Sequence, residues 1–236
     1  MRFLYIFPHP DDESFGPALA ISAQRRAGHE VHLLTLTRGG ATKQRHKLCL
    51  SVEEMGEVRY REMQEVARVL ELSGLTVLDL PDSGLKEMNP IEIEREVREH
   101  IERLRPEVVV SYAVYGVSAL HDHLVTHAAV KRVYCELLGD RAGYLRRLAM
   151  FTLDDSQLPD SDIPFQLQAS KPEEIDCVME VEEADIEAAH RALACYETYQ
   201  QVIDEVDPLG LIGNRVNFEI FGESHDPPLR DLTEGL

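Results

Sequence analysis

Apolar runs alternate with amphipathic stretches along the first 140 residues of the chain. Residues 3–7 form an unbroken apolar run that ends at Pro8, which predicts a buried strand of a parallel sheet. Further strands are predicted at 31–37, 75–80 and 108–112, and helices at 53–72, at 90–104 and from Asp122 to about Leu138. Strands that alternate with helices predict the α/β class, as a Rossmann-like, doubly wound, mostly parallel sheet with helices on both faces.

After residue 146 the pattern of apolar and polar positions is less regular. It predicts strands at 149–153, 175–181 and 218–221, a proline-rich loop at 154–172 and one long helix at 184–202. A chain of 236 residues is long enough to bury one ordinary core. We therefore predict a single domain over residues 1–222. The tail, residues 223–236, is expected to be loose or to pack on a neighbouring subunit.

The charge balance narrows the classes of partner. With 43 acidic and 24 basic residues the formal net charge is −19, which argues against nucleic acids and anionic membranes. No apolar stretch is long enough for a membrane span, and the N-terminus shows no secretory signal. The 4 cysteines are scattered without CxxC pairing, so we expect reduced thiols and a cytoplasmic protein.

A dense polar motif follows the first predicted strand. It reads Pro8-His9-Pro10-Asp11-Asp12-Glu13, and the carboxyl edge of an open α/β sheet is where ligands bind. An imidazole and three carboxylates so close together repel one another unless a cation holds them, and zinc accepts nitrogen and oxygen ligands. The alternative is that an aspartate or Ser14 merely caps the next helix. The prolines on either side of His9 stiffen the turn and favour the metal site.

A second polar cluster follows the strand at 108–112. It contains His121, Asp122, His123 and His127. His123 and His127 are four positions apart, so they share one face of a helix. Because a catalytic zinc site needs three protein ligands and a water, this cluster supplies what the first motif lacks.

The first motif closely resembles the AHPDDE motif of the PIG-L/LmbE-like deacetylases, with Pro8 in place of the usual alanine. Members of that family are zinc-dependent hydrolases that remove acetyl groups from N-acetylglucosamine-type substrates. The resemblance implies that His9 and Asp12 bind zinc and that Asp11 is the general base. The family's second motif is a histidine, proline, aspartate and histidine in a row. Aligning its last two residues with Asp122 and His123 implies that His123 is the third zinc ligand.

The second motif departs from the family at two positions. Leu120 stands where the family has a histidine thought to stabilise the oxyanion, and His121 stands where it has a proline. Either His121 swings in as a catalytic residue that supplies the lost positive charge, or another group does so, or the site is impaired. His127 is expected at the surface or behind the ligands.

Two further positions match substrate-binding residues of the family. Arg59 falls where the family has a substrate-contacting arginine, although an ion pair with Glu62 one turn away is the plainer interpretation. Asp82 lies in a turn that resembles a sugar-binding loop, although Pro-Asp-Ser-Gly is also an ordinary turn. The basic segment 41–51 is expected to be a surface loop or a substrate-facing lid.

The function predicted is metal-dependent hydrolysis of the acetyl group of an N-acetylated amino sugar or its conjugate, with zinc-activated water and Asp11 as general base. Iron(II) or another divalent ion can take the same ligands. The alternative is a catalytically impaired zinc- or sugar-binding member of the family. A nucleotide-binding protein is disfavoured because no GxGxxG follows the first strand. The family often assembles, so a homo-oligomer is consistent with the resemblance.

Overall fold

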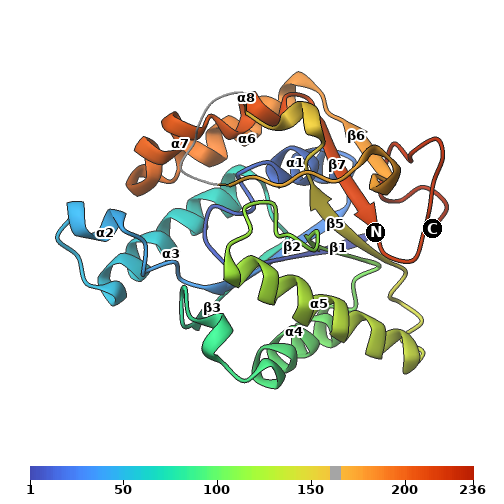
Figure 1. The fold of residues 1–236 in the computed structure, drawn as a ribbon, viewed down its shortest axis with the longest axis horizontal. Helices are drawn as coiled ribbons and strands as arrows, with labels where there is room; N and C mark the ends of the chain where they lie inside the picture. The colour runs from blue at the N-terminus through green and yellow to red at the C-terminus, as the bar shows by residue number, and fades with distance from the viewer. Residues whose placement is uncertain (160–165) are drawn as a thin grey trace.

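Within residues 1–159 and 166–236, which the computed structural model describes, seven strands form one sheet with the order β3-β2-β1-β4-β5-β7-β6 (Figure 1). The strands are β1 (Arg2–Phe7), β2 (Glu30–Thr37), β3 (Gly74–Leu80), β4 (Val108–Tyr112), β5 (Arg147–Thr152), β6 (Cys177–Glu180) and β7 (Arg215–Ile220). All neighbouring pairs are parallel except those of β7, which runs antiparallel to β5 and β6. The predicted α/β class with a mostly parallel sheet is confirmed.

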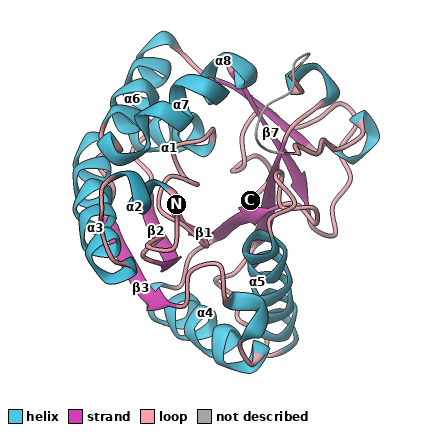
Figure 2. Cartoon of the chain, turned by 60° about the vertical axis from the view of Figure 1, so that its left-hand side comes forward, coloured by secondary structure: helices cyan, strands magenta, loops and turns pink. Residues whose placement is uncertain are grey.

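Helices cover both faces of the sheet, as the sequence predicts. They are α1 (Pro17–Arg26), α2 (Gln44–Lys47), α3 (Val52–Val69), α4 (Pro90–Leu104), α5 (His121–Gly139), α6 (Glu183–Ala194), α7 (Gln200–Val206) and α8 (Pro208–Ile212). Short 3₁₀ turns occur at Leu85–Glu87, Asp155–Gln157, Pro172–Glu174 and Glu197–Tyr199. Figure 2 shows α4 and α5 on one side of the sheet and α1, α3 and α6 on the other.

The apolar run of β1 is buried on both faces, which explains why it has no polar alternation. Phe3, Tyr5 and Phe7 pack in the core beneath α1, α3 and α6. Leu4 and Ile6 point the other way and pack beneath α4 and α5. Successive side chains of a strand alternate between faces, so a central strand between two helical layers must be apolar throughout.

The chain changes direction across the sheet between β1 and β4. From β1 it winds to β2 and β3 on one side, and from β4 it winds to β5 on the other. β1 and β4 lie side by side and parallel, so their carboxyl ends meet at one edge. In open α/β sheets this topological switch point is where ligands bind.

The single helix predicted at 184–202 is wrong, because α6 ends at Ala194 and α7 begins at Gln200. The Gln200 side-chain amide donates to the carbonyl oxygens of Leu193 at 2.9 Å and Tyr196 at 3.1 Å, which ties the start of α7 to the last turn of α6 and to the segment between the two helices. The Tyr196 hydroxyl donates to Glu13 at 2.7 Å. Side-chain partners therefore end a helix that the apolar spacing alone would continue.

The C-terminal tail packs on its own sheet, which contradicts the expectation that it is loose or held by a neighbour. Val178 of β6 donates to the Leu229 carbonyl at 2.8 Å, and Arg147 of β5 donates to the Leu232 carbonyl at 2.6 Å. The Leu232 side chain is fully buried. The predicted loop at 154–172 lies partly outside the described residues. Within the described ranges, no helix has the length and apolar character needed to cross a membrane.

Candidate metal centre and its pocket

The turn after β1 holds the first polar motif rigidly. Asp11 has a φ of 87°, a left-handed conformation that is strained for a residue with a side chain. Its carbonyl oxygen accepts from the backbone of Ser14 at 2.8 Å and of Phe15 at 3.0 Å. The backbone N–H of His9 donates to Asp12 Oδ2 at 2.8 Å. These bonds fix both His9 and Asp12 before α1 begins.

The loop after β4 orients His123. Gly116, Val117 and Ala119 all have positive φ values, and α5 then begins at His121. His123 Nδ1 lies 2.8 Å from the Gly116 carbonyl oxygen and 3.1 Å from Ser118 Oγ. A carbonyl can only accept, so this ring nitrogen carries the hydrogen and Nε2 is left as the donor atom for a metal.

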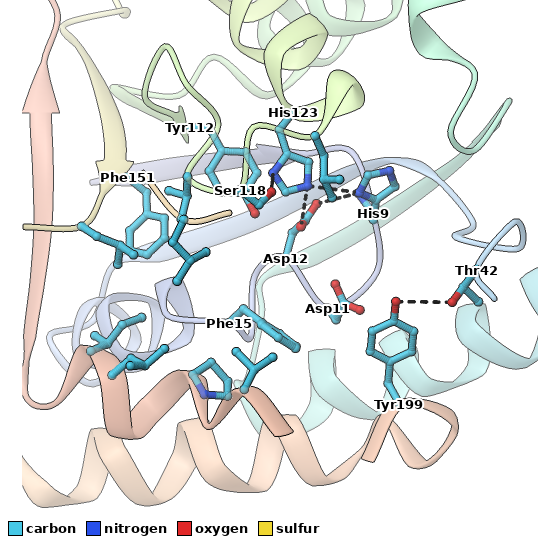
Figure 3. Close-up of a pocket in the computed structure, with 18 of the residues that line it drawn as sticks. His9, Asp11, Asp12, Phe15, Thr42, Tyr112, Ser118, His123, Phe151 and Tyr199 are labelled. Carbon is cyan, nitrogen blue, oxygen red and sulfur yellow. Dashed lines mark hydrogen bonds and ion pairs between the residues drawn. The ribbon is translucent and has the colours of Figure 1, made fainter. Parts of the chain in front are cut away.

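The structure brings His9, Asp12 and His123 together at the carboxyl edge (Figure 3). His123 Nε2 lies 3.2 Å from Asp12 Oδ1 and 3.3 Å from His9 Nδ1, and His9 Nδ1 lies 3.5 Å from Asp12 Oδ2. Two nitrogen or oxygen ligands on a tetrahedral zinc ion are roughly 3.3 Å apart, given bond lengths of about 2.0–2.1 Å. These three residues, hereafter the His-Asp cluster, therefore fit a divalent cation in number, type and spacing.

The opposite nitrogen of His9 faces two other carboxylates. His9 Nε2 lies 3.2 Å from Asp122 Oδ2 and 3.4 Å from Asp82 Oδ1. The second oxygens of these carboxylates accept from backbone N–H groups, of Leu85 for Asp122 and of Ala41 for Asp82. This arrangement orients the His9 ring and directs Nδ1 at the His-Asp cluster. No role was predicted for Asp122, although its place between His121 and His123 was the available signal.

The surrounding charges favour a cation at the centre. Burial lowers the pKa of His9, but hydrogen bonds to Asp12 and Asp122 outweigh it and raise this pKa to about 10. Burial raises the pKa of Asp12, but His123 and His9 hold it well below its usual range. The carboxylates thus stabilise positive charge here, whether it comes from protons or from a metal ion.

Asp11 and Arg59 form a buried pair beside the His-Asp cluster. Arg59 Nη2 donates to Asp11 Oδ2 at 2.5 Å and to the Pro10 carbonyl at 2.7 Å, and its guanidinium lies 4.5 Å from the centre of the Tyr199 ring. Burial raises the pKa of Asp11 to about 6, although Arg59 acts against this rise. The ion pair expected between Arg59 and Glu62 does not form, since Glu62 accepts from Thr198 instead.

A cavity of about 200 Å³ opens beside these residues. Its polar wall contains Thr42, Arg59, Asp82 and Tyr199, and Thr42 Oγ1 donates to the Tyr199 hydroxyl at 3.3 Å. Thr42 is the one residue of the basic segment 41–51 that lines the cavity among the described residues. Tyr199 was not predicted to line the cavity, because its position was assigned to a single helix over 184–202 and it lies instead in the turn Glu197–Tyr199.

His121 is not brought into this site, contrary to the expectation that it swings in as a catalytic residue. It is exposed, and it is not one of the described residues that line the cavity. Leu120 does line the cavity and is 43% exposed. His127 is buried and its Nδ1 lies 2.8 Å from the Tyr112 carbonyl oxygen, so it does not join the His-Asp cluster. Tyr112 itself was missed, although its ring stacks on His123 at 4.4 Å.

The fold and the position of this site define an α/β protein with a candidate metal centre at the topological switch point. A protein-family model described as GlcNAc-PI de-N-acetylase, PIG-L, matches residues 4–134, which span the strands and loops that build the centre. The chain belongs to this family. The resemblance stated from the sequence is thereby confirmed.

Curated relatives carry deacetylase names. The chain is 28% identical over 166 residues to a 1D-myo-inositol 2-acetamido-2-deoxy-alpha-D-glucopyranoside deacetylase of Kineococcus radiotolerans, covering 59% of this chain and 46% of that protein. It is 30% identical over 129 residues to a probable N-acetyl-alpha-D-glucosaminyl L-malate deacetylase 2 of Bacillus anthracis, covering 54% and 56%. The chain thus spans about half the length of these two relatives. It is 24% identical over 202 residues to the bovine N-acetylglucosaminyl-phosphatidylinositol de-N-acetylase, covering 84% and 74%.

Solved structures share the fold at low identity. An N,N'-diacetylchitobiose deacetylase from Pyrococcus horikoshii has a TM-score of 0.70 at 16% identity, covering 93% of this chain and 83% of that one. A deacetylase of the teicoplanin biosynthesis pathway has a TM-score of 0.71 at 15% identity, covering 93% and 97%. These likenesses show that the whole sheet, including the late strands, follows the architecture of known deacetylases.

Proposed function

We propose that the protein is a metal-dependent hydrolase that removes an acetyl group from an N-acetylglucosamine-type substrate. The observation that carries the proposal is the convergence of His9, Asp12 and His123 within 4.8 Å at the edge of a cavity that also contains Asp11. The names of the curated relatives support an N-acetylated amino sugar or its conjugate as the substrate.

The His-Asp cluster would hold the ion. A bound zinc or iron(II) ion would polarise the acyl carbonyl and activate water at neutral pH. His123 is held by Gly116 and Ser118, and His9 by Asp122, so neither ligand ring has to be reoriented for binding. Preorganised ligands of this kind reduce the ordering cost of binding.

Asp11 is the proposed general base. Its raised pKa of about 6 leaves it mostly ionised at neutral pH and close enough to that pH to accept a proton efficiently. Arg59 binds one carboxylate oxygen, and the structure gives the other no protein partner among the described residues. Arg59 therefore positions Asp11, and together with Asp82 it is the proposed contact for substrate hydroxyls on the polar wall of the cavity.

A second candidate function is favoured by one observation. Leu120 occupies the cavity wall where the family's second motif has a histidine, and the exposed His121 does not replace it. Losing one oxyanion donor lowers turnover by roughly 10²–10³ in enzymes of known mechanism. The alternative is therefore a zinc- or sugar-binding member of the family with impaired catalysis.

Acetate release separates the two functions. The protein is loaded with zinc or iron(II) and incubated with N-acetylglucosamine, a glycoside of it and a thiol conjugate of it. We expect acetate from at least one substrate, and none after chelation. Asp11→Asn should retain one metal ion per chain and lose at least ~100-fold in turnover, since general bases contribute about 10²–10⁴. Stoichiometric metal with no acetate from any substrate would support the impaired function instead.

A further inference from the structure

The cavity has a second wall that the proposed function does not use. The described side chains of this wall are hydrocarbon, and we call it the apolar arm; it includes Phe15, Phe151, Leu153, Val206, Leu211 and Ile212. In Figure 3, Phe151 and Phe15 lie on one side of Asp12, whereas Tyr199 and Thr42 lie on the other. The His-Asp cluster thus stands between a polar and an apolar half of one cavity.

The apolar arm begins directly beside the candidate metal ligands. The Tyr112 ring stacks on His123 with the ring centres 4.4 Å apart, and Phe151 lies 6.3 Å from the same ring in a tilted contact. Phe151 in turn packs against Ile212 over Gly16, where an added Cβ would lie 2.7 Å from Phe151 and 2.3 Å from Ile212. Gly16, with a φ of 138°, therefore leaves the room in which Phe151 and Ile212 take these positions.

The two halves match the two substituents of an amide substrate. The amine side of an amino-sugar amide carries hydroxyl groups, which would lose hydrogen bonds in a hydrocarbon arm at a cost of roughly 1–3 kcal/mol each. The polar wall offers Thr42, Asp82 and Tyr199 to those hydroxyls. With the sugar on the polar wall and the carbonyl at the His-Asp cluster, the acyl substituent would extend into the apolar arm.

We propose that the substrate of this site carries an unbranched acyl chain longer than acetyl, such as hexanoyl or octanoyl, bound in the apolar arm. This inference rests on the proposed function as an amide hydrolase and names its acyl class. The volume of about 200 Å³ belongs to the whole cavity, polar wall included. The apolar arm draws hydrocarbon side chains from β5, α7 and α8, more than the methyl group of an acetyl can contact at once.

The reaction balances without any further reactant. Water adds its oxygen to the acyl carbonyl carbon, the bond between that carbon and the nitrogen breaks, and the nitrogen gains both protons of the water. The products are the fatty carboxylate and the ammonium form of the amino sugar. Asp11 carries the proton from the water towards the leaving nitrogen, as in the acetyl reaction.

The test varies the length of the N-acyl group and, separately, the place on the sugar where a hydrocarbon chain is attached. The metal-loaded protein is assayed with N-acetyl-, N-butanoyl- and N-hexanoylglucosamine, and with hexyl N-acetylglucosaminide, which places the same hydrocarbon on the sugar instead. We expect kcat/KM to rise by about fourfold for each methylene that becomes buried, and at least tenfold from acetyl to hexanoyl. The hexyl glycoside should show no such gain. A preference for acetyl, or a gain for the hexyl glycoside alone, would overturn the proposal.

A charge in the apolar arm gives a residue-level test. Leu211 of α8 is only partly buried, so Leu211→Asp should fold, and it should lower the ratio of hexanoyl to acetyl kcat/KM at least tenfold. The matched control is Leu138→Asp, an exposed leucine of α5 outside the cavity, for which the ratio should not change. If the ratio is unchanged in both Leu211→Asp and Leu211→Phe, the acyl chain of the substrate does not lie in the apolar arm.

Binding separates this inference from the proposed function. Calorimetry with metal-loaded Asp11→Asn should show N-hexanoylglucosamine binding at least tenfold more tightly than N-acetylglucosamine. If no amide is hydrolysed by the unaltered protein but this preference holds, the hydrolase proposal fails and the acyl-binding arm stands. If acetate is released and the preference is absent or reversed, the acyl inference fails alone.

Discussion

His9 Nε2 lies 3.2 Å from Asp122 Oδ2, although 113 residues separate the two positions in the chain. The contact joins the loop after β1 to the first turn of α5, and it uses the ring nitrogen that faces away from the His-Asp cluster. A carboxylate in this position fixes the ring and increases the basicity of the opposite nitrogen. The two loops are therefore linked twice, once through the candidate metal ligands and once behind them.

Removing this support should weaken metal binding without removing a ligand. We expect Asp122→Ala to lower zinc affinity by ~10–100-fold, the usual effect of losing such a partner. Competition with a chromophoric chelator measures this affinity. Asp140→Ala, an exposed aspartate just beyond α5, is the matched control and should bind zinc like the unaltered protein. Equal affinities in both variants would exclude an orienting role for Asp122.

His121 and His123 should differ sharply when each is replaced by alanine. His123→Ala removes a proposed ligand, so we expect less than stoichiometric zinc after dialysis. His121→Ala alters an exposed side chain outside the cavity and should retain one zinc ion per chain. Elemental analysis of both proteins gives the answer. Retained zinc in His123→Ala would instead direct attention to Asp82 and Asp122 around His9.

Gly116 should be needed for the position of His123. It has a φ of 60°, and an added Cβ would lie 2.5 Å from His123 Cβ. We expect Gly116→Ala to lower zinc affinity at least ~10-fold and stability by about 1–2 kcal/mol, the usual cost of a strained backbone. Gly213→Ala is the control, since its φ of 66° is also positive but nothing lies within 4 Å of an added Cβ. That variant should lose stability and keep its zinc affinity, as chelator competition and thermal unfolding would show.

Asp185 should stabilise the fold in a pH-dependent way. It is fully buried and accepts from Ser22 and Arg26 of α1, which ties α1 to α6. Burial raises the pKa of Asp185, but bonds from Arg26, Glu182 and Ser22 outweigh this and lower the pKa below its usual value. Because the folded pKa lies below the unfolded pKa, the contribution is complete above about pH 4 and is lost as the pH falls through the folded pKa.

We therefore expect Asp185→Asn to lower the free energy of unfolding by ~1–3 kcal/mol at pH 7, the cost of disrupting a buried hydrogen-bonded carboxylate. The difference from the unaltered protein should shrink below about pH 4. Urea unfolding between pH 7 and pH 3 measures both. Asp204→Asn on the exposed side of α7 should show no difference at any pH. A constant difference across the range would contradict the titration argument.

The alternation of strands and helices predicted the first half of the sheet closely, because the central strands β1 and β4 are built mainly from unbroken apolar runs. The polar residues that follow β1 and β4 meet because the carboxyl ends of parallel neighbours lie at one edge of the sheet. His121 was misplaced for a geometric reason. Residues two apart on a helix point roughly 200° apart, so His121 and His123 cannot both face the cavity.

Other features depend on contacts that a linear pattern does not contain. The break between α6 and α7 follows from Gln200 and from the bond between Tyr196 and Glu13. The role of Asp122 depends on β1 and β4 being neighbours, and the apolar arm combines α8 with β5 and the start of α1. Each of these arises only when distant segments of the chain meet.

The antiparallel strand β7 lies between β5 and β6, although it is the last strand in the chain. During synthesis, neither β5 nor β6 can pair with β7 until residues 215–220 have been made. Until then each exposes a row of unpaired backbone groups, which is a template for pairing with another chain. A ribosome-bound intermediate that lacks β7 should therefore be the species most prone to aggregate and most dependent on chaperones.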